Sequence, residues 1–154
     1  MKICILYGTE SGNSELVATD LFESLDDDHD VVLEDLADVD VASLEPTALH
    51  LIICSTHGEG DPPQSALPFL EGAKNTRVNL TGIRYAMFGL GDSTYVNYSR
   101  GSEHVDELLA GSGAERVGEY GRHDAASRDD ASALAEEWAR NVLETVPDLE
   151  SASL

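Results

Sequence analysis

The sequence predicts an α/β fold in which helices cover both faces of a parallel β-sheet. Short apolar runs alternate along the chain with stretches whose apolar residues recur every three or four positions. The apolar runs are continuous, as expected for strands that are buried on both faces. Regular alternation of strands and helices is typical of a parallel sheet. We therefore expect one domain with five strands and roughly four helices.

The first half of the chain contains three of the predicted strands. KICILY, VVLEDL and HLIICS are expected to form strands at residues 2–7, 31–36 and 50–55. Residues 14–25 have the periodicity of a helix, and a shorter helix is expected near residues 66–72. The buried face of the longer helix is predicted to carry Leu16, Val17, Leu21, Phe22 and Leu25.

The second half continues the alternation. IRYAMFGLG and ERVGEYG are expected to form strands at residues 83–91 and 115–121. Residues 103–109 are predicted to lie in a helix that ends near Gly111 or Gly113. Glycine is common just past the end of a helix, which supports this boundary.

The last predicted helix spans residues 128–146, where large apolar residues recur at four-residue steps before a proline. These residues are Leu134, Trp138, Val142 and Val146. The domain is expected to occupy residues 1–147, and residues 148–154 are expected to form a flexible tail.

The composition is strongly acidic. The 154 residues include 30 Asp and Glu against 9 Lys and Arg, which makes a formal net charge of −21. Nucleic acids and anionic membranes are therefore not expected as partners. An acid excess with few lysines resembles the surface of proteins from a high-salt cytoplasm. Ordinary solubility, or the steering of a basic partner, would explain the same charge.

Targeting and redox signals are few. No apolar stretch reaches the roughly 18 residues that a membrane helix needs. The apolar run at the N-terminus is too short for a signal peptide, so we expect a cytoplasmic protein. Cys4 and Cys54 lie inside apolar runs without metal-ligand spacing and are expected to be reduced, buried thiols.

Polar loops follow the first, third and fourth predicted strands, where open parallel sheets bind their ligands. The first loop, GTESGNS, opens a helix and combines hydroxyl side chains with two glycines. Backbone N–H groups at a helix N-terminus bind anions, although a plain turn capped by Ser11 is an alternative. The loop is neither a Walker A motif nor a dinucleotide fingerprint. Since it contains no cation, it favours a monophosphate.

The other two loops are STHGEGDPP after the third strand and GLGDSTYVNY after the fourth. In the former, His57, Glu59 and Asp61 stand at alternate positions. They would suit a metal-dependent hydrolase only if the chain were extended there, because only then would they share a face. In the latter, Tyr95 and Tyr98 are aromatic residues at the ligand edge, with packing at the loop base as the alternative.

Together, YGTESGNSE, STHGEGDPP and FGLGDSTYVNY resemble the ordered motifs of the flavodoxin family. The resemblance is closest to the FMN-binding modules of diflavin reductases, including the sulfite reductase flavoprotein and cytochrome reductases, and to stand-alone flavodoxins of the MioC type. It covers the chain to about residue 146. It implies a flavodoxin-like three-layer sandwich with a five-stranded parallel sheet in the order 2-1-3-4-5.

The resemblance also implies which residues bind FMN. The first loop is expected to hold the phosphate, and the other two are expected to grip the isoalloxazine ring, with Tyr95 stacked on one face. The implied residues are Thr9, Glu10, Ser11, Gly12, Asn13 and Ser14; then Ser55, Thr56, His57 and Gly58; then Leu90, Gly91, Asp92, Tyr95, Asn97, Tyr98 and Ser99.

His57 departs from the reductase modules, which usually have a tyrosine at this place. The difference implies a smaller ring against the flavin and a side chain that titrates near neutral pH. Glu59, Asp61 and Asp92 would oppose negative charge on a reduced flavin. Asp124, in GRHDAA, is a looser match to the same edge.

The resemblance therefore implies an FMN electron carrier without substrate chemistry of its own. It would move single electrons from a flavin reductase or a ferredoxin-type donor to an acceptor enzyme, both in trans. Nothing after Val146 is expected to bind NADPH or FAD, and no metal is expected. The alternative is a flavin-free signalling or assembly module. Response regulators share this topology, but GTESG stands where they need an acidic cluster.

Overall fold

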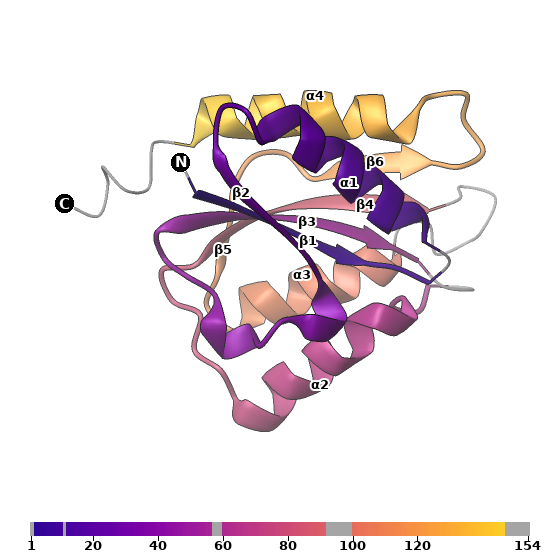
Figure 1. Ribbon diagram of the computed structural model, residues 1–154. Coiled ribbons are helices and arrows are strands. Elements are labelled where there is room, and N and C mark those ends of the chain that lie inside the picture. Colours follow the sequence, from indigo (N-terminus) through magenta and orange to yellow (C-terminus); the bar gives the residue numbers. More distant parts are fainter. Residues whose placement is uncertain (1, 11, 57–59, 92–99, 147–154) are drawn as a thin grey trace.

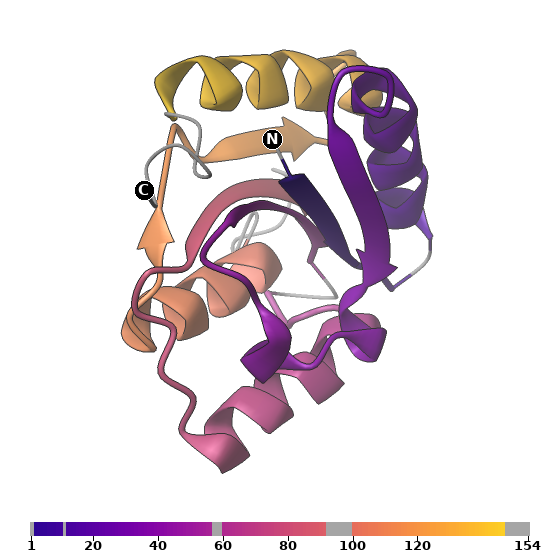
Figure 2. The same ribbon diagram turned by 60° about the vertical axis from the view of Figure 1, so that its left-hand side comes forward.

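The computed structural model describes residues 2–10, 12–56, 60–91 and 100–146. In these residues a β-sheet lies between two layers of helices (Figures 1 and 2). The strands are β1 (Lys2–Gly8), β2 (Asp30–Asp35), β3 (Ala48–Ser55), β4 (Arg84–Gly91), β5 (Glu115–Arg116) and β6 (Gly121–Asp124). The α-helices are α1 (Asn13–Leu25), α2 (Leu67–Thr76), α3 (Arg100–Gly111) and α4 (Ala131–Thr145). Three short 3₁₀ helices are η1 (Leu36–Asp38), η2 (Val41–Ser43) and η3 (Gln64–Ala66).

The strand order is β2-β1-β3-β4-β5, with β6 also paired to β4, and every pairing is parallel. The predicted fold class and the order 2-1-3-4-5 are therefore confirmed. Helices α1 and α4 cover one face of the sheet, and α2 and α3 cover the other (Figure 2). Each layer closes its own hydrophobic core against the sheet.

The central strands explain why the sequence forms this sheet. Seven of the eight residues of β3 are buried, as are six of the eight residues of β4. Successive side chains point to opposite faces, so Leu51 and Ile53 enter the α1–α4 core while Ile52 and Cys54 enter the α2–α3 core. Both cores therefore depend on the same two strands.

The fifth predicted strand is wrong in its extent, because it is divided in two. Arg84 pairs with Glu115, and Phe88 pairs with Gly121. From the first pair to the second, β4 runs four residues, whereas the partner segment runs six. Two residues of the partner segment therefore have no counterpart in β4. Nε1 of Trp138 donates a hydrogen bond of 3.0 Å to the carbonyl oxygen of Glu119 in this segment. A contact from α4 thus stabilises the interruption.

Other boundaries differ by a few residues, most of all in the helices. The last helix begins at Ala131, since Asp130 caps it by accepting a hydrogen bond from the N–H of Ala133. The face predicted for the first helix is partly wrong, because Leu16 is 63% exposed. The stripe that α1 buries consists of Ser14, Val17, Ala18, Leu21 and Leu25.

Both cysteines are free, but only Cys54 is fully buried. Burial raises the pKa of the Cys54 thiol, which keeps it protonated. Cys4 is only partly buried, so its predicted burial is wrong in degree. Among the residues that the structure describes, none of the helices has the length and hydropathy that a transmembrane span requires.

His50 is a buried polar residue at the centre of the sheet, with 1% of its surface exposed. Its Nδ1 lies 3.0 Å from the carbonyl oxygen of Arg84, and its Nε2 lies 3.4 Å from the backbone nitrogen of Glu45. Because a carbonyl only accepts, Nδ1 carries the proton and Nε2 accepts from Glu45. Burial lowers the pKa of His50 from its ordinary value.

His50 should make the protein less stable as the pH falls. Its pKa is lower in the folded chain than in the unfolded chain, so the unfolded state takes up the proton first. Below the ordinary value of 6.5, each pH unit should remove up to about 1.4 kcal/mol of stability until the folded-state pKa is reached. Urea unfolding at pH 8 and pH 5.5 should show a larger loss for the wild type than for His50→Gln. Equal losses would contradict this.

Gly121→Ala should destabilise the protein by about 1–3 kcal/mol. A Cβ at this position would lie 2.6 Å from Cδ2 of Phe88 and 2.7 Å from Cδ1 of Trp138, two aromatic rings packed in the core. Gly72→Ala is the matched control, because a Cβ there meets nothing within 4 Å. It should stabilise α2 by about 0.5–1 kcal/mol. Thermal unfolding of both variants tests the contrast, and a neutral Gly121→Ala would contradict it.

Candidate functional site

The predicted loops leave the sheet at one edge. Gly8, the last residue of β1, pairs with Cys54, and Ser55, the last residue of β3, pairs with Leu90. The hydroxyl of Ser55 donates to the carbonyl oxygen of Gly8 over 3.3 Å. The starts of the three loops are therefore neighbours at the carboxyl ends of β1, β3 and β4 (Figure 1).

Among the described residues of the first loop, no side chain caps the N-terminus of α1. The N-cap of α1 is Gly12, with φ of 96°, a left-handed conformation that favours glycine. Since the N-cap is a glycine, it has no side chain to accept from the first turn, and the alternative of a plain turn capped by Ser11 is wrong. The first-turn N–H groups and the positive end of the helix dipole suit an anion.

The hydroxyl of Ser14 supports this interpretation. Ser14 is completely buried, and its Oγ has no hydrogen-bond partner among the residues that the structure describes. Leaving a buried hydroxyl without a partner costs about 1–3 kcal/mol, so such groups are rare. A phosphate oxygen at the start of α1 would accept its proton. The first loop therefore fits the phosphate of FMN.

The first loop is also tied to the segment that follows the third-strand loop. The N–H of Thr9 donates to Oγ of Ser65 over 2.7 Å, and the N–H of Ser65 donates to the carbonyl oxygen of Thr9 over 3.2 Å. Oε2 of Glu10 accepts from the N–H of Gln64 over 2.6 Å. One carboxylate oxygen of Glu10 thus supports η3. The sequence analysis missed Gln64 and Ser65, since no local pattern links positions so far apart.

The described parts of the other two loops offer mainly backbone and hydroxyl groups. Oγ1 of Thr56 accepts from the N–H of Gly101 over 3.0 Å. The side chain of Leu90 is buried in the α1–α4 core, so only its backbone can face a ligand. The carbonyl oxygen of Gly91 accepts from the N–H of Ala125 over 2.8 Å. Several predicted residues lie outside the described part of the chain: Ser11, His57, Gly58, Asp92, Tyr95, Asn97, Tyr98 and Ser99.

Of Glu59, Asp61, Asp92 and Asp124, only Asp61 and Asp124 lie within the described residues. Asp124 ends β6 opposite Gly91, and its Oδ1 accepts from the N–H of Ala126 over 2.9 Å. Asp61 is exposed, whereas His57 and Glu59 lie outside the described residues. Within residues 2–10, 12–56, 60–91 and 100–146, no group of three or more His, Cys, Asp or Glu side chains is placed to hold a metal ion.

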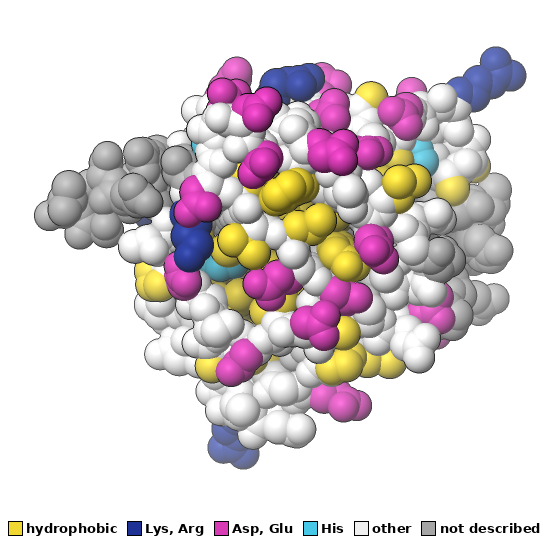
Figure 3. All heavy atoms as spheres, in the orientation of Figure 1, with side chains coloured by type: hydrophobic (Ala, Val, Ile, Leu, Met, Phe, Trp, Pro, Cys, Tyr) yellow, Lys and Arg dark blue, Asp and Glu magenta, His cyan; other side chains and the backbone are white. Residues whose placement is uncertain are grey.

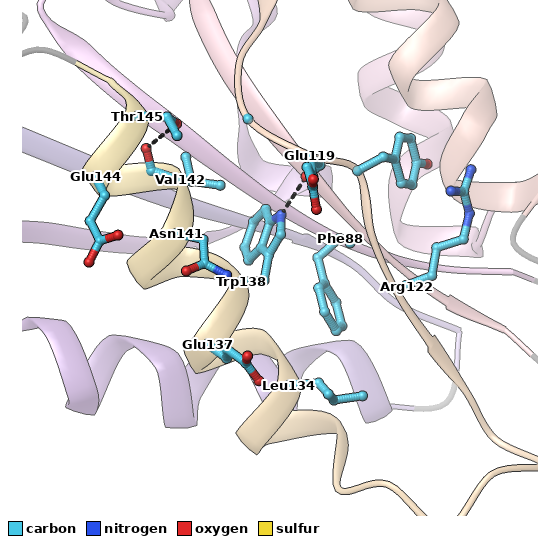
Figure 4. Close-up of a pocket in the computed structure, with 13 residues that line it drawn as sticks. Phe88, Glu119, Arg122, Leu134, Glu137, Trp138, Asn141, Val142, Glu144 and Thr145 are labelled. Atoms are coloured by element: carbon cyan, nitrogen blue, oxygen red, sulfur yellow. Dashed lines mark hydrogen bonds between the residues drawn. The ribbon is translucent and has the colours of Figure 1, made fainter.

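A groove of about 570 Å³ lies away from these loops, between α4 and the interrupted edge at residues 118–122 (Figure 4). Phe88 and Trp138 form its apolar floor, with ring centroids 5.4 Å apart. Glu119 and Glu137 stand along its sides (Figure 4). The interrupted segment of the fifth strand lines the groove, whereas the strand ends that carry the polar loops do not.

Acidic side chains are spread over the face that carries α1 and β2 (Figure 3). Several of the few cations pair with acids, as Arg116 does with Asp106 at 2.9 Å and Arg100 with Glu107 at 2.5 Å. Residues 8–14 contain neither Lys nor Arg. Anion binding at the first loop would therefore depend on N–H groups, hydroxyls and the helix dipole.

Known proteins resemble this chain over most of its length. The family model for flavodoxin matches residues 5–138. The chain is 36% identical over 137 residues to the NADPH–cytochrome P450 reductase of Musca domestica, a match that covers 85% of this chain and 20% of that protein. It is also 36% identical over 130 residues to the mitochondrial NADP(+) pyruvate dehydrogenase of Euglena gracilis, covering 82% and 7%. The chain thus spans a fifth or less of these curated relatives.

Solved structures match the whole fold. Oxidised flavodoxin 2 from Bacillus cereus superposes with a TM-score of 0.80 at 30% identity, covering 95% of this chain and 100% of that one. A flavodoxin from Pseudomonas aeruginosa, solved as a cysteine-to-alanine mutant, gives a TM-score of 0.81 at 27% identity, with coverage of 94% and 99%.

Ser14→Ala should weaken FMN binding without destabilising the protein that lacks FMN. The variant removes a buried hydroxyl that has no partner among the described residues, so the urea midpoint of the apoprotein should stay equal or rise. A hydrogen bond to a charged phosphate contributes about 1.5–3 kcal/mol, so the dissociation constant should rise roughly 10- to 100-fold.

Thr19→Ala is the control for this test. It lies on the same helix, and its hydroxyl donates to the carbonyl oxygen of Glu15 over 2.8 Å. Fluorescence titration with FMN should show unchanged affinity for Thr19→Ala. If Ser14→Ala kept the wild-type affinity, its hydroxyl would not contact the phosphate.

Proposed function

Since the chain belongs to the flavodoxin family, we propose that it binds FMN and carries single electrons between a separate reductase and an acceptor enzyme. The observation that carries this proposal is the start of α1, where a glycine N-cap stands beside a buried Ser14 hydroxyl that has no partner in the described part of the chain. The family motif predicts the phosphate at this place. The flavin-free alternative is not favoured, because it leaves this buried group without a role.

FMN, when bound, would supply the one-electron chemistry, and the protein would hold and tune it. The first-turn N–H groups of α1 and the hydroxyls of Thr9 and Ser14 would bind the phosphate. The left-handed conformation of Gly12 allows the turn that leads into α1. The loops after β3 and β4 would hold the isoalloxazine ring between them, because the resemblance assigns ring-binding residues to both loops.

The finer parts of the proposal concern partners and setting. We propose that electrons arrive from a flavin reductase or ferredoxin-type donor in trans, and that the chain has no substrate chemistry of its own. Similarity to NADPH–cytochrome P450 reductases supports a partner of the reductase type. The net charge of −21 supports a high-salt cytoplasm as the setting, and it does not favour nucleic acid as a partner.

FMN should bind the purified protein in a 1:1 ratio and give it flavin absorption bands. Riboflavin, which lacks the phosphate, is the matched ligand control. Losing two or more hydrogen bonds to a charged phosphate should weaken its binding at least about 100-fold. A folded protein that binds no FMN at high salt would refute the function. Equal affinity for both ligands would refute the phosphate site alone.

Electron transfer is tested with the reconstituted protein. Stepwise reduction should separate two one-electron potentials, and the reduced protein should pass electrons to a one-electron acceptor such as cytochrome c. The apoprotein is the control and should show neither behaviour. Transfer that is no faster than with free FMN would contradict a carrier function.

A further inference from the structure

Helix α3 lies against both ends of residues 57–59, the stretch for which the resemblance implies contact with the flavin ring. Thr56 precedes this stretch, and Gly60 and Asp61 follow it. The first turns of α3 touch all three residues, through Gly101 and His104. The helix belongs to the layer below the sheet in Figure 1 and starts directly after residues 92–99, the other ring-binding stretch.

The contact at Gly101 is between backbones. A Cβ added at Gly101 would lie 2.5 Å from Cα of Thr56, 2.6 Å from the carbonyl oxygen of Asp61 and 2.7 Å from that of Ser55. Real Cβ atoms do not approach backbone atoms so closely, so no other residue fits without moving the helix or the loop. Ser55, Thr56 and Asp61 therefore all pack against Gly101 of α3.

Hydrogen bonds fix the same two ends. The N–H of Gly101 donates to Oγ1 of Thr56 over 3.0 Å. Nε2 of His104 lies 3.1 Å from the carbonyl oxygen of Gly60, and because a carbonyl only accepts, this nitrogen donates. Gly101 and His104 are three positions apart and share one face of α3. Gly60 is buried and has φ of 121°, a conformation that other residues rarely adopt.

We propose that Gly101 and His104 are positioning residues, which hold Thr56 and Gly60 against α3 and so set where Thr56, one of the implied FMN-binding residues, meets the flavin. This inference rests on the proposed function. Because both contacts come from the first turns of one helix, they also hold Thr56 and Gly60 relative to each other.

The test removes the hydrogen bond of His104 and keeps the ring. His104→Phe cannot donate to Gly60, whereas His104→Gln retains an N–H donor. Loss of one hydrogen bond should raise the FMN dissociation constant about 3- to 10-fold in His104→Phe and should shift the two one-electron potentials. In the His104→Phe apoprotein, the backbone amides of residues 57–61 should exchange hydrogen faster than in the wild-type apoprotein. His104→Gln should restore much of the wild-type behaviour.

Tyr85→Phe is the matched control. The hydroxyl of Tyr85 donates to Oδ1 of Asp106 over 2.6 Å, so this variant also removes a hydrogen bond that holds α3. It lies at the other end of β4 from the loops, near the pairing of Arg84 with Glu115. Its stability should fall, while its FMN affinity and potentials should stay as in the wild type. This contrast separates positioning from general stabilisation of the helix.

The outcomes are distinct. Wild-type affinity, potentials and exchange in His104→Phe would overturn the inference, as would equal effects in Tyr85→Phe. A wild-type protein that binds no FMN would refute the proposed function, and the exchange measurement on the apoprotein would still test the anchoring by His104. If His104→Phe did not fold, His104→Ala would remove the same donor without the bulk of a ring.

Discussion

The parallel, in-register pairing of β1, β3 and β4 is the constraint on which the rest of the structure depends. It brings Gly8, Ser55 and Gly91 to one edge, where all three polar loops begin. A slip of one residue would turn each side chain to the other face. In β3 this would exchange Ile53 and Cys54 between the two cores. The same burial that stabilises the sheet therefore aligns the site.

In the proposed site, the helices would bind the phosphate without any Lys or Arg from residues 8–14. Helix α1 supplies N–H groups and the hydroxyl of Ser14, and α3 supports the third-strand loop from below. Buried hydrogen bonds are less sensitive to salt than exposed ion pairs, because screening acts mainly on exposed charges. In a chain with a net charge of −21, a phosphate site made of neutral donors is thus compatible with concentrated salt.

Local patterns predicted most elements, but they failed for the extent of the fifth strand and for the buried face of α1. Alternation and burial identified the strands, and the paired apolar layers confirmed the fold class. The fifth strand was predicted as continuous, although ERVGEYG contains Gly118, which lies in the interruption with φ of 71°. Trp138, which lies on α4, donates to the carbonyl oxygen of Glu119 within this interruption. Leu16 was assigned to the buried stripe by its hydrophobicity, although Ser14 occupies that stripe instead.

The sequence by itself determined the order of strands and helices and the three loops that carry the flavodoxin motifs, because periodicity and motif spacing are local properties. Only the tertiary structure decided how those loops are held. Thr9 is joined to Ser65 across 56 positions, and His104 to Gly60 across 44. Such contacts arise when packing brings distant segments together, and no local pattern encodes a distance of that kind. Likewise, the resemblance implies that Ser14 binds FMN, but no local pattern shows that its hydroxyl is buried. It becomes a donor without a partner among the described residues only once the core closes around it.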